Sequence, residues 1–296
     1  MNKEHQLLKA LWNISFIFWF ITEYTIAHST VAQIALAFFG VVSLLMIILL
    51  NRLKITLFFG LYCLFVFVCY LNIILGYSIM PTLSKNLLNT LIKNLLFLFF
   101  TIHYFSSYSI ENIKTIFILS TTATSLILLI VTVATTGSFV LRGEGSLTNA
   151  NSLAISNAFS ICWIISSNKK IKALQYTNLA VLIFFCILSG TRKAILAAAL
   201  GLLVLFCLKY PKRLFRNVLK FAVLSIVIYI CLLKIPFLYN TLGNRIESML
   251  LMLCGGEGDA SAATRHHLIE LGLEYFINRP VFGYGINSFQ TIQGSY

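Results

Sequence analysis

Long apolar stretches constrain the fold of this 296-residue chain more than any other feature. A helix needs about 20 apolar residues to cross a bilayer core, and somewhat fewer where neighbouring helices share the burial. All four prolines fall at or beyond the ends of the stretches, where a helix tolerates them. The sequence therefore predicts an all-α, polytopic transmembrane bundle of about nine spans. We place them at Leu8–Ala27, Thr30–Leu50, Ile55–Leu75, Leu87–Phe105, Ile113–Thr135, Asn151–Ser167, Leu174–Ser189, Ala194–Leu208 and Val218–Ile235.

The composition excludes soluble classes of protein. Hydrophobic residues make up 59% and charged residues 10% of the chain, against roughly 45–50% and 25% in soluble domains. Six of the seven cysteines lie inside apolar stretches, where a thiol behaves as a small hydrophobe, so no disulfide framework is predicted. The net charge of +13 is placed in short loops, which is typical of charge that sets membrane topology and not of nucleic-acid binding.

Lysine and arginine favour one side of the predicted bundle. If the N-terminus is cytoplasmic, 13 of them fall in inside segments and eight in outside segments, and Lys93 lies within the fourth span. Because positive charge in short loops marks the cytoplasmic side, we predict a multi-pass protein with a cytoplasmic N-terminus. Residues 1–236 would form the transmembrane bundle, and residues 237–296 an extracytoplasmic loop segment. The segment from Gly137 to Ala150 would lie outside as well.

The last polar segment, Thr264 to Phe289, is where we expect chemistry, because most of the preceding chain is too apolar for it. Apolar residues recur there at helical spacing, and Pro280 forbids continuation. The pattern predicts an amphipathic helix that lies at a membrane surface, with Arg265 in its first turn. Beyond it, Gly283 and Gly285 allow the backbone to turn sharply or to approach a ligand closely. The apolar positions of the helix are Leu268, Ile269, Leu271 and Phe276.

Two outward arginines are the first candidates for binding an anion. Arg192 opens the eighth span, directly followed by Lys193. A cation at an outer helix start opposes both the topology rule and the helix dipole, which favours a functional role over a simple membrane anchor. The same argument applies to Arg265, whose alternative is a solvated surface arginine. A guanidinium group matches phosphate with two parallel hydrogen bonds.

A second polar element, Arg142 to Ser152, precedes the sixth span. Backbone N–H groups and side-chain amides there could contact a polar ligand, with Arg142, Asn149 and Asn151 as candidates. An ordinary turn with a helix cap explains the same residues equally well. Lys93 either faces a polar interior or extends to the cytoplasmic boundary.

Other ionisable residues give weaker signals. His266 and His267 precede Glu270 by one helical turn, which suits proton transfer as well as an ordinary polar surface. Asp259 is the only aspartate in the sequence, and no cysteine and histidine residues have zinc spacing, so we predict no metal and no cofactor. The sequence contains no Walker loop and no Gly-x-Ser-x-Gly elbow, which argues against ATP-driven and serine-hydrolase chemistry.

These motifs together resemble the O-antigen ligase and O-antigen polymerase membrane family. The resemblance rests on Leu188 to Ala194, on Gly145 to Asn151, and on Thr264-Arg265 followed by Asn278 to Phe289. It covers the second half of the chain. Members of the family are multi-helix, inverting glycosyltransferases that use no metal. They transfer a glycan from undecaprenyl diphosphate to an acceptor at the outer face of the bacterial cytoplasmic membrane.

The resemblance implies roles for residues and partners. Arg192 and Arg265 would contact the donor diphosphate and stabilise it as the leaving group. The implied partners are the lipid bilayer, the lipid-linked glycan and other membrane proteins of polysaccharide assembly. The family has a histidine further along the external loop and more spans after it, so we expect a C-terminally truncated chain that lacks this base. The candidates for substrate binding are Arg142, Asn149, Asn151, Lys193, Gly283 and Gly285.

Two alternatives stay open. A flippase or transporter for lipid-linked oligosaccharide would need polar groups along a path through the membrane, where only Glu23 and Lys93 qualify, and no internal repeat is visible. An inactive fragment of a polymerase would follow from truncation alone.

Overall fold

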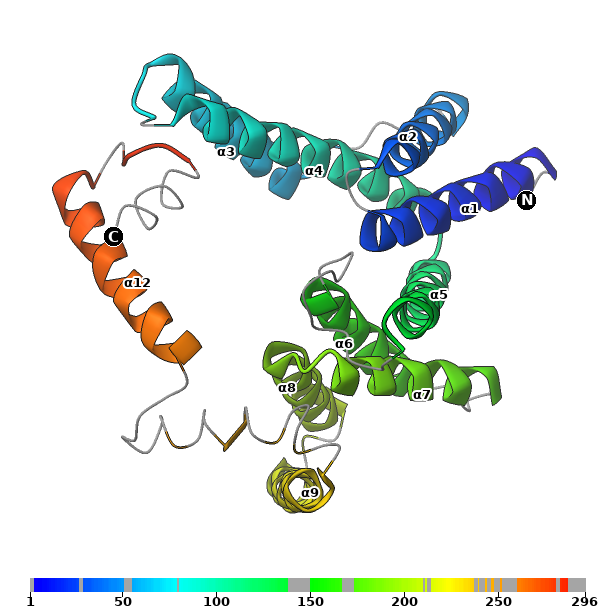
Figure 1. The fold of residues 1–296 in the computed structure, drawn as a ribbon. Coiled ribbons are helices and arrows are strands. Elements are labelled where there is room, and N and C mark those ends of the chain that lie inside the picture. Colours follow the sequence, from blue (N-terminus) through cyan, green and yellow to red (C-terminus); the bar gives the residue numbers. More distant parts are fainter. Residues whose placement is uncertain are drawn as a thin grey trace. The chain divides into compact units, whose positions relative to one another are not determined.

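The computed structural model describes residues 3–26, 29–50, 55–78, 80–137, 150–166, 173–209, 211, 214–236, 239, 243, 246–247, 251, 260–280 and 283–286. Within these ranges the regular structure is helical and contains no strand (Figure 1), so the predicted all-α fold is confirmed. In chain order the helices are α1 (Lys3–Thr25), α2 (Thr30–Leu50), α3 (Leu57–Ile74), α4 (Pro81–Ser107), α5 (Ile110–Thr136), α6 (Ala150–Ser166), α7 (Ala173–Leu188), α8 (Arg192–Lys209), α9 (Leu214–Lys234) and α12 (Ala260–Asn278).

Every predicted span carries a helix. Among the described residues, four helices are long and apolar enough, by length and composition, to cross a membrane, and α6 and α7 are shorter apolar helices. α4 begins at Pro81, earlier than the predicted Leu87, because proline at the first helical position loses no intrahelical hydrogen bond. The four long segments are Thr30–Leu50, Leu57–Ile74, Pro81–Tyr104 and Ile110–Thr136.

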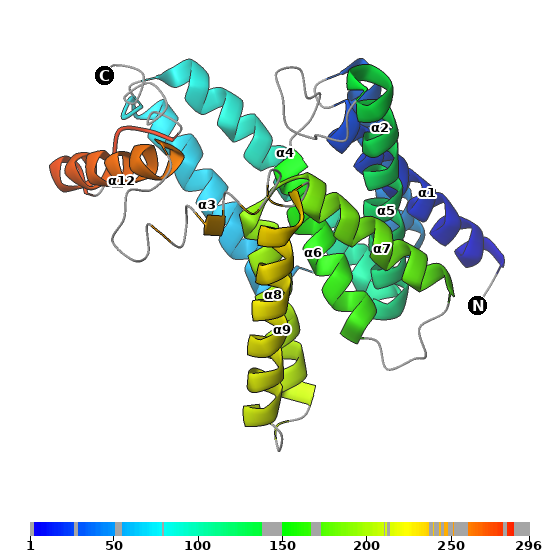
Figure 2. The same cartoon turned by 60° about the horizontal axis from the view of Figure 1, so that its bottom comes forward.

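The first compact unit comprises Met1–Val42 and Ser109–Gly256. In it α5 packs against α1, α6 and α7, and α6 packs against α7 and α8. Figure 2 shows α9 beside α8, which it also contacts. Phe117 of α5 makes edge-on ring contacts with Phe20 of α1 and Trp163 of α6. Aromatic pairs of this kind each stabilise packing by about 0.5–1.5 kcal/mol beyond their burial.

The α6 and α8 helices run in the same direction and pack closely. Thr191, directly before α8, bonds to Asn151 at the start of α6, and further along both helices Cys162 Sγ lies 3.8 Å from the Ala198 carbonyl oxygen. A Cβ at Gly201 would lie 2.8 Å from Cys162 Sγ, so the absence of a side chain there allows the two helices to approach. Both helix N-termini therefore lie at the same end of this unit.

The second compact unit comprises Ser43–Tyr108 and Glu257–Tyr296. α3 and α4 form a helical hairpin whose buried core consists of Val66, Cys69 and Leu88. α12 belongs to this unit. The predicted division at residue 236 concerns position relative to the membrane, and it stays a prediction.

Candidate functional site

The two polar motifs before α6 and α8 meet in the structure. The Thr191 hydroxyl donates a hydrogen bond of 2.7 Å to Oδ1 of Asn151, 40 residues away in sequence. Thr191 is buried, whereas Asn151 is exposed. Gly190 has a φ of 57°, in the left-handed region that glycine adopts readily, and this allows the sharp turn from α7 into α8. Packing thus joins two motifs that the sequence presents separately.

Thr191 also fixes the first turn of α8. Its carbonyl oxygen accepts hydrogen bonds from the backbone N–H groups of Ala194, at 3.1 Å, and Ile195, at 3.4 Å. Its own N–H donates to Ser189 Oγ at 3.3 Å. One threonine therefore holds the start of α8 and ties it to the start of α6.

The joined helix ends form a positively polarised surface. The first backbone N–H groups of a helix, before its hydrogen-bond ladder begins, carry partial positive charge, and two such helix ends lie together here. Arg192 and Lys193 are the first two residues of α8, and the Lys193 side chain is exposed. This arrangement suits a ligand that carries phosphate.

Further along α6, polar side chains join it to α5 inside the unit. The Asn157 amide nitrogen donates to Ser125 Oγ at 2.8 Å, and the hydroxyls of Ser160 and Thr121 share a hydrogen bond of 2.9 Å. All four side chains are buried. Asn157 Oδ1 is buried without a hydrogen-bond partner among the described residues. We call these four residues the α5–α6 polar layer.

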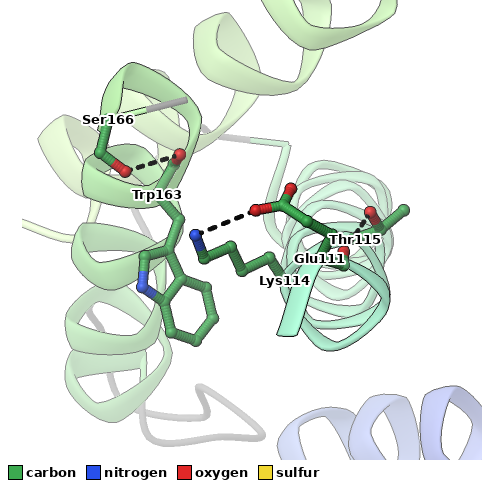
Figure 3. Close-up of polar contacts among 5 residues, drawn as sticks. All are labelled: Glu111, Lys114, Thr115, Trp163 and Ser166. Atoms are coloured by element: carbon green, nitrogen blue, oxygen red, sulfur yellow. Dashed lines mark hydrogen bonds and ion pairs between the residues drawn. The ribbon is translucent and has the colours of Figure 1, made fainter. Parts of the chain in front are cut away.

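The opposite ends of α5 and α6 carry ordinary surface contacts. Figure 3 shows Lys114 paired with Glu111 of the same helix at 3.4 Å, and Ser166 Oγ donating to the Trp163 carbonyl oxygen at 3.1 Å. A cavity of about 320 Å³ at this end is lined mostly by apolar residues of α6 and α8, together with Ser166 and Lys209. The concentration of helix N-termini and cationic residues at the other end makes that end the better candidate.

The two glycines after α12 share a left-handed backbone conformation but differ in their surroundings. Gly283 has a φ of 61° and Gly285 a φ of 97°, so both form the predicted sharp turn. A Cβ at Gly285 would lie 2.5 Å from Cα of Ser78, whereas one at Gly283 would meet nothing within 4 Å. Gly285 therefore permits close approach to the connection between α3 and α4. A role of either glycine in binding substrate stays a prediction.

The prediction that Arg265 lies in a first helical turn was wrong. α12 begins at Ala260, which puts Arg265 in the second turn. Residues 260, 262 and 263 are alanines, the strongest helix formers, and they extend the helix toward its N-terminus. The argument from an opposed helix dipole therefore no longer applies to Arg265. Its candidacy rests on the family resemblance.

Other candidates are described in part. Arg192 lies in the first unit and Arg265 in the second, and their side chains fall outside the described part of the structure. Arg142 and Asn149 are outside the described residues altogether. The Lys93 side chain is exposed, which favours extension to a boundary over a place in a polar interior.

No metal site emerges from the part of the chain that the structure describes. There, no group of three or more histidine, cysteine, aspartate or glutamate side chains is placed to hold a metal ion. Metal-independent chemistry stays a prediction.

Thr191 of the candidate site and Asn157 of the α5–α6 polar layer were not singled out from the sequence. Thr191 directly precedes a predicted helix, where threonine is a preferred cap, so its position could have indicated a role at the helix start. Asn157 is an amide within an apolar stretch, and such residues often form hydrogen bonds between membrane helices. Neither signal identifies the partner residue.

The fold and the joined helix ends define an all-α membrane protein with a polar, cationic surface where α6 and α8 begin. Residues 177–296 match the family model described as O-antigen ligase. The match confirms the predicted resemblance to the O-antigen ligase and polymerase family, and it supports a membrane enzyme of surface-polysaccharide assembly. It includes Arg192 and Arg265 together with α8, α9 and α12. No curated protein and no solved structure matches the chain.

Proposed function

We propose that the protein is a membrane glycosyltransferase that transfers a glycan from undecaprenyl diphosphate to an acceptor during assembly of a bacterial surface polysaccharide. The observation that carries this proposal is the hydrogen bond between Thr191 and Asn151, which joins two helix N-termini directly before Arg192. Helix N-termini and guanidinium groups both favour phosphate oxygens. The O-antigen ligase match over residues 177–296 adds the polysaccharide context.

In the proposed reaction, the protein accelerates transfer mainly by stabilising the leaving group. The acceptor hydroxyl attacks the anomeric carbon opposite the diphosphate, and a new carbon–oxygen bond forms as the bond to the diphosphate oxygen breaks. The electron pair leaves with undecaprenyl diphosphate, and the hydroxyl proton passes to a general base. Arg192 and Arg265 contact the diphosphate and stabilise its developing charge, which is commonly the largest catalytic contribution.

Further candidate contacts with the substrate follow from where other residues lie. Asn151 and Lys193 are exposed at the joined helix ends and would bind the phosphate or the first sugar. Arg142 and Asn149 precede α6 in sequence and would act beside them. Gly283 and Gly285 would bring the backbone near the glycan.

The arginine assignment is tested by complementing a deletion strain with Arg192→Ala and Arg265→Ala. Loss of one electrostatic donor should slow transfer by about 10²–10³-fold, so polysaccharide length and yield should collapse while the protein is still inserted in the membrane. Arg216→Ala is the matched control, because Arg216 is an exposed arginine on α9 outside the candidate site. Normal polysaccharide in both test variants would remove the assignment.

Arg192→Lys separates charge from geometry. Lysine keeps the positive charge but cannot form two parallel hydrogen bonds to one phosphate. Activity should therefore lie between that of the wild type and that of Arg192→Ala, measured in the same strain. Full activity would show that only charge is required.

A second candidate function is transport of the lipid-linked glycan across the membrane. The α5–α6 polar layer favours it, since buried polar groups inside membrane helices often mark substrate paths. The same layer is explained by hydrogen bonding between helices, which holds α6 in place. Formation of a new glycosidic bond distinguishes the two functions.

A further inference from the structure

The apolar residues of α12 lie on two different faces. Leu271 is buried at 6% exposure, and Leu268 and Tyr275 are half-buried. Four other apolar side chains are between 57% and 74% exposed. They are Ile269, Leu273, Phe276 and Ile277, which we call the α12 apolar stripe.

The spacing of the stripe makes it continuous. Its residues are separated by four, three and one positions, so they lie along one side of the helix over more than two turns. Leu268, Leu271 and Tyr275 follow the same periodicity on the opposite side. α12 therefore faces the protein on one side and leaves an apolar face uncovered on the other.

The turn after α12 is fixed to the hairpin of α3 and α4. The Ser84 hydroxyl donates to the Ile286 carbonyl oxygen at 2.6 Å, and the Ile286 side chain packs against the hairpin core. Gly285 approaches Ser78 in the connection between the two helices. These contacts hold the C-terminal end of α12 near the connection.

The same turn folds back on α12. The Tyr284 ring lies edge-on to Tyr275, with centroids 5.1 Å apart, and the Arg279 guanidinium lies 4.7 Å from the centre of the Tyr284 ring. The turn therefore contacts both the C-terminal end of α12 and the hairpin of α3 and α4 (Figure 1).

The hairpin of α3 and α4 indicates where α12 lies relative to the membrane. Leu57–Ile74 and Pro81–Tyr104 are long and apolar enough to cross a bilayer, so their short connection lies at a membrane–water boundary. A helix whose end is fixed to that connection is held within reach of the lipid headgroups. Exposed charged side chains on α12, Glu270 and Glu274, lie to one side of the stripe and can remain in water.

We propose that α12 docks on the bilayer surface with its apolar stripe among the upper acyl chains, in the leaflet beside the connection between α3 and α4. The occupant of the stripe is lipid, because the membrane-crossing hairpin is what holds α12. The functional consequence of docking rests on the proposed function, since docking would keep Arg265 at the depth of a lipid-linked diphosphate. Docking itself is independent of any reaction.

Fluorescence quenching in nanodiscs tests the docking. Phe276→Trp and Leu273→Trp place a probe on the stripe, and Glu274→Trp places the matched probe on the polar side of the same helix. Each variant is compared with the wild type to isolate the added emission. Lipids brominated high on the acyl chain should quench the two stripe probes, while aqueous iodide should quench the Glu274→Trp probe.

Two results would overturn the docking. Quenching of the stripe probes by iodide would mean that the stripe faces water, and quenching by neither agent would mean that protein, for instance a second copy of the chain, covers it. Unchanged thermal unfolding of all three variants confirms that they are folded. No glycan is transferred in this measurement. If the arginine variants proved fully active, the proposed function would fail, but the docking of α12 would be unaffected.

Discussion

Gly283 and Gly285 occupy one turn with positive φ, yet their surroundings differ. Gly285 sits against the backbone of Ser78, and Gly283 has open space around the position of a Cβ. The pair therefore separates two reasons for a glycine, which are backbone conformation and close approach. A similar contrast holds for two threonines. The Thr191 hydroxyl joins two helices, whereas the Thr177 hydroxyl donates to the Ala173 carbonyl oxygen of its own helix.

Gly285→Ala should weaken the attachment of the turn far more than Gly283→Ala. A left-handed residue other than glycine costs about 1 kcal/mol or somewhat more at either position, but only the Gly285 variant also forces two backbones apart. Thermal unfolding in nanodiscs should show a clearly larger loss for Gly285→Ala. Equal losses would mean that the contact with Ser78 contributes nothing.

Thr191→Val tests the joint between α6 and α8. The substitution keeps the side-chain shape and removes the hydrogen bond to Asn151, which should lower the free energy of unfolding by about 0.5–1.5 kcal/mol. Transfer activity should fall as well, because the two helix ends are no longer tied. Thr177→Val is the control and should leave both quantities nearly unchanged. A stable Thr191→Val protein with full activity would contradict a role for the joint in the site.

At the level of helices, the fold was predictable because crossing a bilayer requires long apolar segments, and each one here became a helix. The ends were less predictable. Pro81 and the alanines at 260, 262 and 263 extend two helices beyond their apolar patterns, since helix starts depend on local propensity as well as burial. The contact of Thr191 with Asn151 depends on how α6 and α8 pack, which periodicity within one helix does not specify.

Asn157→Ala tests the α5–α6 polar layer. Hydrogen bonds between membrane helices contribute about 0.5–2 kcal/mol, so removing the amide should destabilise the protein within that range. A double-mutant cycle with Ser125→Ala should give a combined effect smaller than the sum, because both substitutions remove the same 2.8 Å hydrogen bond. Strict additivity, measured by unfolding in nanodiscs, would show that the two groups are not coupled.

For the whole molecule, we predict the orientation in the membrane from the distribution of lysine and arginine, and this prediction is directly testable. In a variant without native cysteines, Thr264→Cys should react with a membrane-impermeant maleimide added to spheroplasts, and Arg216→Cys should react only after lysis. Both positions are exposed. The reverse pattern would put α12 in the cytoplasm, away from any donor at the outer face.

The most direct test of glycan transfer uses purified protein in vesicles that contain undecaprenyl diphosphate linked to a radiolabelled glycan. We expect a new glycosidic bond, seen as a longer or transferred glycan, together with release of undecaprenyl diphosphate, and loss of both with Arg192→Ala. Movement of the intact lipid-linked glycan across the bilayer, with no new bond and no released diphosphate, would contradict the proposed transfer.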